Sequence, residues 1–525
     1  MSMPSYDLLV IGGGINGAGI ARDATGRGLK VLLVERDDLA AHTSSASTKL
    51  IHGGLRYLEY GEFRLVREAL QERERLLAIA PHLIWPLRFV LPLPKGGRPA
   101  WMIRLGLWLY DHIGGRISLP SSQAVRLSGP GPAGGLAGGL AGGLAGGLVG
   151  VLRPELTRGF AYSDCWVDDA RLVVANAMDA AAGGATILTG VAVLAARPVG
   201  DAWEVDLAAN PDRPAPTVPL PPKVWARAVV NAAGPWVEDV LATMPAARHQ
   251  GGVSLVKGSH IIVPRRWAGP QAYIFQNPDG RIQFAIPYQQ HFTLIGTTDV
   301  LAGDDERAQP AISEAEVEYL CAGVNAFLAE PISRADILSS YAGVRPLYDD
   351  GSTDAKAITR DYVLNLGADA RPQVLSVFGG KLTTYRRLAE HALEKLAPWL
   401  PPMRPAWTDQ QPLPGGDLPG GDADAYMAYA RQRWAFLDEQ QARRMVRAYG
   451  TRIGKVLGTA QTRADLGEDF GGGLSGAEVD YLVAHEWART AQDILWRRTK
   501  LGLVTPQGTA EKLTAYLCAK GKAAA

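Results

Sequence analysis

Residues 6–36 are the feature of this sequence that most limits how the chain can fold. They spell YDLLVIGGGINGAGIARDATGRGLKVLLVER, which predicts an apolar strand, a glycine turn, a helix and a second apolar strand ending on Glu35. Gly12, Gly14 and Gly17 fit the pattern G-x-G-x-x-G, which permits a tight turn, approach of the backbone to a pyrophosphate, and packing of helix on strand. The free N–H groups of the helix N-terminus can bind the phosphates. Glu35 can accept hydrogen bonds from a ribose and disfavours a 2′-phosphate, so the motif predicts FAD or NAD rather than NADP.

Composition excludes several other functions. The chain has 525 residues, enough for two or three domains, and its net charge of +1 without a basic run argues against nucleic-acid binding. Cys165, Cys321 and Cys518 have neither the spacing of a disulfide framework nor that of a metal site, which favours a reducing compartment. There is no signal-peptide pattern, and no window has the roughly 18 apolar residues of a membrane-spanning helix. We therefore expect a protein that is soluble or lies on a membrane surface.

Two later glycine turns favour FAD over NAD. Residues 226–240 (ARAVVNAAGPWVEDV) predict an apolar strand that runs into Gly234. Residues 372–396 predict another strand, then Gly379 and Gly380, then a helix. Either turn alone is also typical of a plain strand-to-helix connection. Glycine turns so far apart indicate a sheet domain interrupted by insertions, whereas NAD enzymes usually complete their nucleotide domain in one block.

Several longer stretches carry a more specific pattern. They are, in chain order, IGGGINGAGIARDA, TSSASTKLIHGGLRYLEYGEFRLV, RPAWMIRLGLWLYDHIG, GFAYSDCWVDDARL, YAGVRPL, AITRDY and FGGKLTTYRRLAEHALEKL. Together they resemble the aerobic, respiratory FAD-dependent glycerol-3-phosphate dehydrogenases, which belong to the D-amino-acid-oxidase-like flavoproteins. The resemblance extends from about residue 6 to about residue 515.

The resemblance implies an α/β (overall α+β) fold. A Rossmann-like FAD domain is interleaved with an antiparallel-sheet substrate domain, and a helical domain follows at the C-terminus. The implied boundaries are residues 1–400 for the oxidoreductase region, with FAD-binding parts at about 1–85, 150–250 and 340–400 and substrate parts at about 86–149 and 251–339, and residues 401–525 for the helical domain.

The resemblance also implies an activity. The family oxidises sn-glycerol 3-phosphate to dihydroxyacetone phosphate by transfer of a hydride from C2 to flavin N5, and passes the electrons to ubiquinone or menaquinone in the membrane. We therefore expect non-covalently bound FAD, peripheral attachment to the cytoplasmic side of the membrane, and a homodimer.

The substrate carries a phosphate dianion, which arginine binds through a planar and permanently charged fork. The resemblance assigns substrate contacts to His52, Arg56, Tyr57, Arg345 and Lys381. Of these we predict all but Tyr57 as catalytic residues. Neutral imidazole can take the hydroxyl proton, so His52 is a candidate base.

Three further assignments in the substrate site are open to a second interpretation. His260 is another candidate base, although we favour its interpretation as a core histidine bonded to backbone. Arg360 is a candidate phosphate ligand, but it adjoins Asp361, which favours a salt bridge. Lys381 follows the Gly379–Gly380 turn and could approach the N1–C2 edge of the flavin, where a cation stabilises the reduced cofactor.

The cofactor contacts that we predict combine the glycine turns with the hydroxyl run TSSAS and its flanks. They are Gly12, Gly14, Asn16, Gly17, Glu35, Arg36, Thr43, Ser44, Ser45, Thr48, Lys49, Gly53, Gly54, Gly234, Gly379, Gly380, Lys381, Leu382 and Thr383. Gly53 and Gly54 are expected to permit close approach to the flavin ring. No metal site is predicted.

Outside these motifs, four segments bear on organisation. Residues 101–113 predict a short apolar helix flanked by arginines, either a buried core helix or, as we favour, one that lies in the membrane interface. The AGGL repeat at residues 133–148 predicts a flexible insertion. Residues 400–426 are rich in proline and glycine and predict a linker. Beyond them, helical spacing up to residue 499 predicts a small α domain for packing, dimerisation or positioning on the membrane.

The sequence leaves three other functions open. A glycerol-3-phosphate oxidase would pass the electrons to oxygen, and an amine or amino-acid oxidase of the same fold would bind a carboxylate with fewer arginines. A flavin-binding sensor or scaffold without catalysis belongs to a different class.

Overall fold

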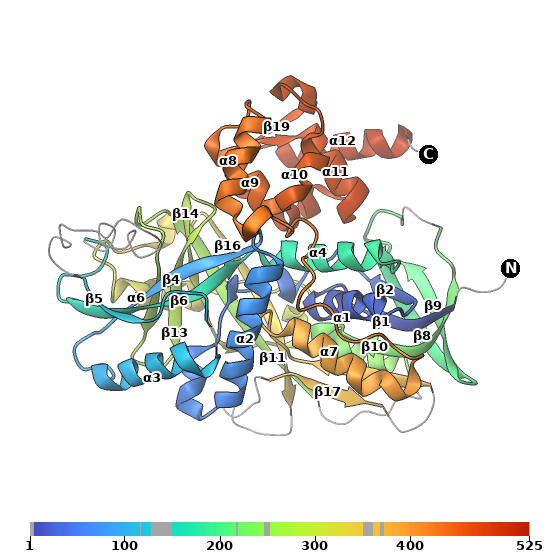
Figure 1. Cartoon of the computed structure of the whole chain (residues 1–525), viewed down its shortest axis with the longest axis horizontal. Helices are drawn as coiled ribbons and strands as arrows, with labels where there is room; N and C mark the ends of the chain where they lie inside the picture. Colours follow the sequence, from blue (N-terminus) through green and yellow to red (C-terminus); the bar gives the residue numbers. More distant parts are fainter. Residues whose placement is uncertain are drawn as a thin grey trace.

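The computed structural model describes residues 5–115, 117–127, 150–216, 219–245, 252–349, 361–367 and 372–523. These residues form two large sheets side by side, with a layer of C-terminal helices packed across them (Figure 1). The AGGL repeat at 133–148 and Arg360 lie outside the described residues.

The first sheet, sheet A, contains five parallel strands in the order β18-β10-β1-β2-β7. Antiparallel β17 flanks β18, and the β8–β9 hairpin continues from β10. The strands are β1 Ser5–Ile11, β2 Val31–Glu35, β7 Thr186–Thr189, β8 Val191–Val199, β9 Ala202–Ala209, β10 Lys223–Asn231, β17 Val363–Leu366 and β18 Gln373–Phe378. All five residues of β2 are buried, as expected for a parallel strand covered on both faces.

Helices cover sheet A, and the parallel strands between them bring distant segments of the chain to one edge. Helix α1 (Ile15–Gly26) packs against α4 (Asp169–Ala182) and α7 (Tyr385–Leu396), while the short α5 (Val237–Ala242) follows β10. Because every parallel strand ends at the same edge, the turns after β1, β2, β10 and β18 converge there. The predicted strand–turn–helix–strand unit at residues 6–36 is therefore observed, and the later glycine turns belong to the same sheet.

The second sheet, sheet B, is mostly antiparallel, in the order β15-β11-β14-β13-β12-β4-β6-β3, with β16 beside β11 and β5 beside β6. Its strands are β3 Leu50–Ile51, β4 Ile84–Pro92, β5 Gln123–Arg126, β6 Arg158–Val167, β11 Gly252–Pro264, β12 Ala272–Gln276, β13 Ile282–Tyr288, β14 Phe292–Gly296, β15 Val300–Leu301 and β16 Ser339–Asp349. Helices α2 (Phe63–Ile79), α3 (Ala100–Ile113) and α6 (Glu314–Asn325) flank it. The predicted fold class is confirmed. Strands β6 and β16 nevertheless join sheet B, although their residues fall inside ranges predicted for FAD binding.

The C-terminal part has a hydrophobic core of its own and forms the layer above α4 in Figure 1. It contains α8 Ala423–Arg433, α9 Glu439–Tyr449, α10 Ile453–Leu457, α11 Gly476–Glu486, the π-helical turn η10 Asp493–Arg498, α12 Thr509–Ala523 and the strands β19 Asp469–Gly471 and β20 Leu474–Ser475. The helical pattern over residues 477–499 is broken at Trp487, whose φ of 55° ends α11. Among the described residues, no helix is long and apolar enough to cross a membrane.

His82 lies buried at the junction between the two sheets and the C-terminal helices. Burial, together with the charges of Arg171 on α4 and Arg447 on α9, lowers its pKa to about 3. The folded protein therefore contains neutral His82, whereas the unfolded chain binds a proton at its ordinary pKa near 6.5. Stability that is complete above pH 6.5 is lost as the pH falls from there towards 3.

We expect the contribution of His82 to the free energy of unfolding to fall by about 2 kcal/mol between pH 7.5 and pH 5. The measurement compares the wild type with His82→Gln in urea unfolding at both pH values. The matched control is His112→Gln, because His112 is exposed on α3. A difference between wild type and His82→Gln that does not change with pH would contradict the assignment.

Candidate active site

A single elongated cavity of about 540 Å³ lies where the strand ends of sheet A meet sheet B. Its volume is in the range of small-molecule and cofactor sites. One end is lined by the turn after β1 and the end of β2. The middle is lined by the segment between β2 and β3, and the other end by strands β11 and β16 and the turn after β18. The cavity therefore connects the nucleotide motif with the antiparallel sheet.

The first glycine turn shapes the nucleotide end of this cavity. Gly12 has φ of 110°, and a Cβ on it would lie 2.4 Å from the carbonyl oxygen of Ala232, at the end of neighbouring β10. A Cβ on Gly17 would lie 1.9 Å from the carbonyl oxygen of Gly12, so α1 packs on the turn only because Gly17 has no side chain. The N-terminus of α1 opens into the cavity, and there the Ile15 N–H donates to Ser44 Oγ at 3.0 Å.

Glu35 closes the same end from the tip of β2. Its two carboxylate oxygens accept the backbone N–H groups of Gly13 at 2.6 Å and Asp37 at 2.7 Å. Burial raises the pKa of Glu35, and these two hydrogen bonds act in the opposite direction. Each oxygen still has a lone pair for a further donor, as a ribose hydroxyl would provide.

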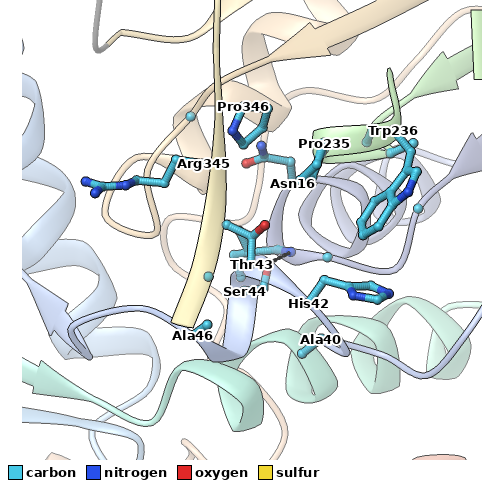
Figure 2. A pocket seen from close by; sticks show the side chains of 18 of the residues that line it. Asn16, Ala40, His42, Thr43, Ser44, Ala46, Pro235, Trp236, Arg345 and Pro346 are labelled. Atoms are coloured by element: carbon cyan, nitrogen blue, oxygen red, sulfur yellow. Dashed lines mark hydrogen bonds between the residues drawn. The ribbon is translucent and has the colours of Figure 1, made fainter. Parts of the chain in front are cut away.

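The wall beside Glu35 contains residues that sequence reasoning missed. His42 and Trp236 face one another with ring centroids 4.5 Å apart (Figure 2), and the Arg36 guanidinium lies 4.9 Å from the Trp236 ring. His42 Nε2 is 2.8 Å from Asp37 Oδ2. The only signal for Trp236 was its position directly after the Gly234 turn, and nothing in the sequence indicated His42.

The opposite end of the cavity contains two histidines, of which His260 is buried and His52 is half-buried. Burial lowers the pKa of His52 to about 4, with smaller effects from Lys381 and Arg73. Burial also lowers the pKa of His260 well below its ordinary value, with further effects from Lys49 and Arg345. Both imidazoles are therefore neutral near pH 7 and able to accept a proton.

Different contacts orient the two histidines. The backbone N–H of His52 donates to Thr383 Oγ1 at 3.2 Å, which ties β3 to the turn after β18. His260 Nε2 is 2.9 Å from Thr48 Oγ1, and its ring stacks on Tyr341 with centroids 4.8 Å apart. His260 Nδ1 has no hydrogen-bond partner among the described residues. The interpretation of His260 as a core histidine bonded to backbone does not match these contacts.

Two cationic side chains line the same end. Lys381 Nζ lies 3.8 Å from the centroid of the Tyr57 ring. Arg345 donates to Asp299 Oδ1 at 2.5 Å and to the Thr298 carbonyl at 3.2 Å, and its side chain points away from the nucleotide end (Figure 2). Asp299, which sequence reasoning missed, therefore already pairs with Arg345, and an anion that binds there has to share this guanidinium.

The cavity fits a flavin dinucleotide. The N-terminus of α1 and the Gly12–Gly14 turn suit a pyrophosphate, and Glu35 suits a ribose. Asn16 donates through Nδ2 to the Gly379 carbonyl at 3.1 Å, while its Oδ1 is buried without a partner in the described part of the chain. An unpartnered buried acceptor at the middle of the cavity is explained by a bound group that donates to it.

Comparison with known proteins agrees with this geometry. The model of the FAD-dependent oxidoreductase family matches residues 7–386, and the model described as the C-terminal domain of alpha-glycerophosphate oxidase matches residues 406–518. The glycerol-3-phosphate dehydrogenase of Pseudomonas aeruginosa is 52% identical over 98% of this chain and 95% of its own length. The aerobic glycerol-3-phosphate dehydrogenase of Escherichia coli is 51% identical over 95% of each chain.

The chain belongs to the FAD-dependent glycerol-3-phosphate dehydrogenase family. The predicted family, oxidoreductase class and FAD cofactor are thereby confirmed. The crystal structure of the glycerol-3-phosphate dehydrogenase from Bacillus halodurans, complexed with FAD, superimposes with a TM-score of 0.70 at 28% identity, covering 95% of this chain and 86% of that one. A further relative is the D-erythritol 1-phosphate dehydrogenase of Brucella abortus, 49% identical over 94% of each chain.

Most residues that we predicted as FAD or substrate contacts line this one cavity. They are Gly12, Gly14, Asn16, Glu35, Arg36, Thr43, Ser44, Thr48, His52, Tyr57, Gly234, His260, Arg345, Gly379, Gly380, Lys381, Leu382 and Thr383. They come from six separate stretches of the chain, and the fold brings them together. Their individual roles remain predictions.

Six predicted residues lie outside the lining, namely Gly17, Ser45, Lys49, Gly53, Gly54 and Arg56. Lys49 is buried in an ion pair with Asp169 at 2.8 Å, which accounts for its charge within the protein. Arg56 donates to the Tyr60 hydroxyl at 3.1 Å. Arg56 is half-buried, and its Nε is buried without a hydrogen-bond partner in the described part of the chain.

The glycine pair after His52 has a packing role in the structure. A Cβ on Gly53 would lie 2.6 Å from Leu70 Cδ2, and Gly54 has φ of 75° with Tyr57 directly against it. The Gly53 N–H donates to the Tyr110 hydroxyl of α3 at 2.7 Å, and this hydroxyl donates to buried Asp164. The turn that carries His52 is therefore fixed by α3 and β6.

Proposed function

We propose that the protein oxidises sn-glycerol 3-phosphate to dihydroxyacetone phosphate with FAD and passes the electrons to a membrane quinone. The observation that carries the proposal is the far end of the cavity, where Arg345 and Lys381 bring positive charge next to two neutral histidines. The names of the relatives that are about half identical over nearly the whole chain support the same substrate.

In this proposal each side chain has a definite task. Arg345 and Lys381 bind the phosphate, because charge-assisted hydrogen bonds to a dianion are stronger than neutral ones. His52 accepts the proton of the secondary hydroxyl, with His260 as the second candidate. FAD, when bound, supplies the acceptor for the hydride that leaves the substrate carbon.

A second substrate of the same chemical class is D-erythritol 1-phosphate, the substrate named for the Brucella abortus relative, which is 49% identical. Both molecules combine a phosphate with a secondary alcohol, so the same cations serve either. They differ in length, and the space beyond His52 and His260 decides between them.

The experiment that tests the proposal follows the flavin spectrum of the purified holoenzyme under anaerobic conditions. We expect glycerol 3-phosphate to bleach the flavin, and glycerol or amino acids to leave it oxidised. Faster bleaching by D-erythritol 1-phosphate would assign the second substrate. Bleaching by an amino acid would assign an amine oxidase, and no bleaching by any of them would favour the non-catalytic sensor.

Arg345→Ala is expected to raise KM by about tenfold or more, because it removes a charge-assisted contact of roughly 1.5–3 kcal/mol. Steady-state kinetics with glycerol 3-phosphate and a quinone analogue measure the effect. Arg281→Ala is the matched control, since Arg281 stacks on Tyr319 and pairs with Asp279 outside the cavity lining. An unchanged KM for Arg345→Ala would remove Arg345 from the site.

His52→Asn is expected to slow flavin reduction by about 100-fold while substrate binding changes little, as for loss of a general base. Stopped-flow bleaching over a range of substrate concentrations separates the two quantities. His260→Asn, measured alongside, should retain the faster rate. If His260→Asn is the slower variant, the base is His260.

Contact with the membrane is part of the proposal, because a quinone lies in lipid. Helix α3 buries Ile103, Leu107 and Tyr110 but exposes four apolar side chains on its other face. These are Trp101, Met102, Leu105 and Trp108, with Tyr60 and Phe63 exposed on the adjoining segment. An exposed apolar face with tryptophans suits the interfacial region of a bilayer. We infer peripheral attachment through this face, on the cytoplasmic side.

Trp108→Glu is expected to weaken binding to vesicles of anionic phospholipid by about tenfold or more, because it removes an apolar side chain worth roughly 1.5–3 kcal/mol when buried. Cosedimentation with vesicles measures the partition. Leu194→Glu is the control, since Leu194 is equally exposed but lies on β8. Equal losses for both variants would contradict attachment through α3.

The choice of electron acceptor distinguishes the dehydrogenase from an oxidase. We expect turnover with a quinone analogue in the absence of oxygen, and little peroxide in air. Full turnover with oxygen and none with the quinone would make the protein an oxidase. The homodimer remains a prediction, to be measured by analytical ultracentrifugation.

A further inference from the structure

The segment that forms the middle of the FAD site has little regular structure of its own. We call residues 36–49, between β2 and β3, the cofactor loop. Its only helical turn is the 3-10 turn Thr43–Ser45, yet it provides much of the cavity lining, including His42 and Ser44. Ala40 and Lys49 both have φ of 59°, which L-residues adopt only where surrounding contacts impose it. The shape of the cofactor loop must therefore be fixed from outside.

One fixing contact comes from the C-terminal domain. Asp38, fully buried in the cofactor loop, accepts hydrogen bonds from Arg498 Nη1 at 2.7 Å and Nη2 at 2.8 Å, and from Arg497 Nε at 2.6 Å. Both arginines belong to η10. Arg498 is fully buried too, and donates in addition to the Glu486 carbonyl at the end of α11. A buried carboxylate with three such donors cannot move without leaving charges unpaired.

A second contact reaches the other end of the cofactor loop. Lys500, just beyond η10, donates to Asp168, the N-cap residue of α4. The next residue, Asp169, accepts from Lys49 Nζ at 2.8 Å and from Ser47 Oγ at 2.7 Å. The C-terminal residues 497–500 therefore contact one end of the cofactor loop directly and the other end through the start of α4.

We propose that the C-terminal domain is a structural part of the FAD site, in which Arg497 and Arg498 are positioning residues that fix the cofactor loop in its FAD-binding form through Asp38. Neither arginine lines the cavity, so they act on FAD only through the loop. This role is distinct from dimerisation or membrane positioning. The inference depends on FAD binding in the cavity, and not on the identity of the substrate or the electron acceptor.

The test measures how readily the full-length holoenzyme releases FAD. Purified holoenzyme is diluted, and the released cofactor is followed by its fluorescence to give a dissociation constant. We expect Arg498→Gln to raise this constant at least tenfold. Arg444→Gln is the matched control, because Arg444 makes a two-bond ion pair with buried Glu478 that lies wholly within the C-terminal domain. It should change the constant less than twofold.

Two results would overturn the proposal. One is FAD release from folded Arg498→Gln within twofold of the wild type, with folding checked by circular dichroism. The other is equal release from Arg444→Gln, which would show that any damage to the C-terminal domain weakens FAD binding. If Arg498→Gln does not fold, Arg497→Lys, which removes the Nε–H···Asp38 bond but keeps the charge, is measured instead. It should raise the constant at least threefold, and a constant within twofold of the wild type would equally overturn the proposal.

Discussion

The site depends on a loop whose shape its own backbone does not determine. Residues 36–49 connect the nucleotide motif of sheet A to the first strand of sheet B, and they carry the middle of the cavity lining. Helix α1 contacts them through Ser44, α4 through Asp169, and the C-terminal helices through Asp38. Sheet B adds further hydrogen bonds, for example between His260 and Thr48. Because the contacts to Asp38 and Asp169 are buried ion pairs, a change at any of them leaves a charge without a partner in a dry interior.

Burial also sets the chemistry at the far end of the cavity. Packing between the two sheets keeps His52 and His260 neutral, while Arg345 shares its charge with Asp299. The net positive charge of this end therefore favours the binding of an anion, and the two uncharged imidazoles can accept a proton. The positive charge and the neutral imidazoles do not depend on one residue, because both arise from the packing of sheet B against the turns of sheet A.

The nucleotide motif could be predicted from the sequence because its strand, turn and helix are local. Gly12, Gly14 and Glu35 needed only spacing to be recognised. The partners of Arg345 and Lys49 could not be found this way. Asp299 lies in the turn between β14 and β15, and it meets Arg345 because β15 and β16 both pair with β11. Asp169 begins α4, and the position of that helix brings it to Lys49. For Gly53 and Gly54 we predicted only that they permit close approach to the flavin ring. Their packing against Leu70 and Tyr57 cannot be seen in the sequence. The same holds for α3, whose apolar composition gave no indication of which face is buried.

Hydrogen–deuterium exchange of the holoenzyme tests whether the cofactor loop is fixed as firmly as the helices that surround it. We expect backbone amides of residues 38–49 to exchange as slowly as those of α1. We also expect removal of FAD to speed exchange in η10 together with the loop, because coupling between two sites is reciprocal. Fast exchange of the loop in the holoenzyme, or an η10 that does not respond to FAD, would contradict these expectations.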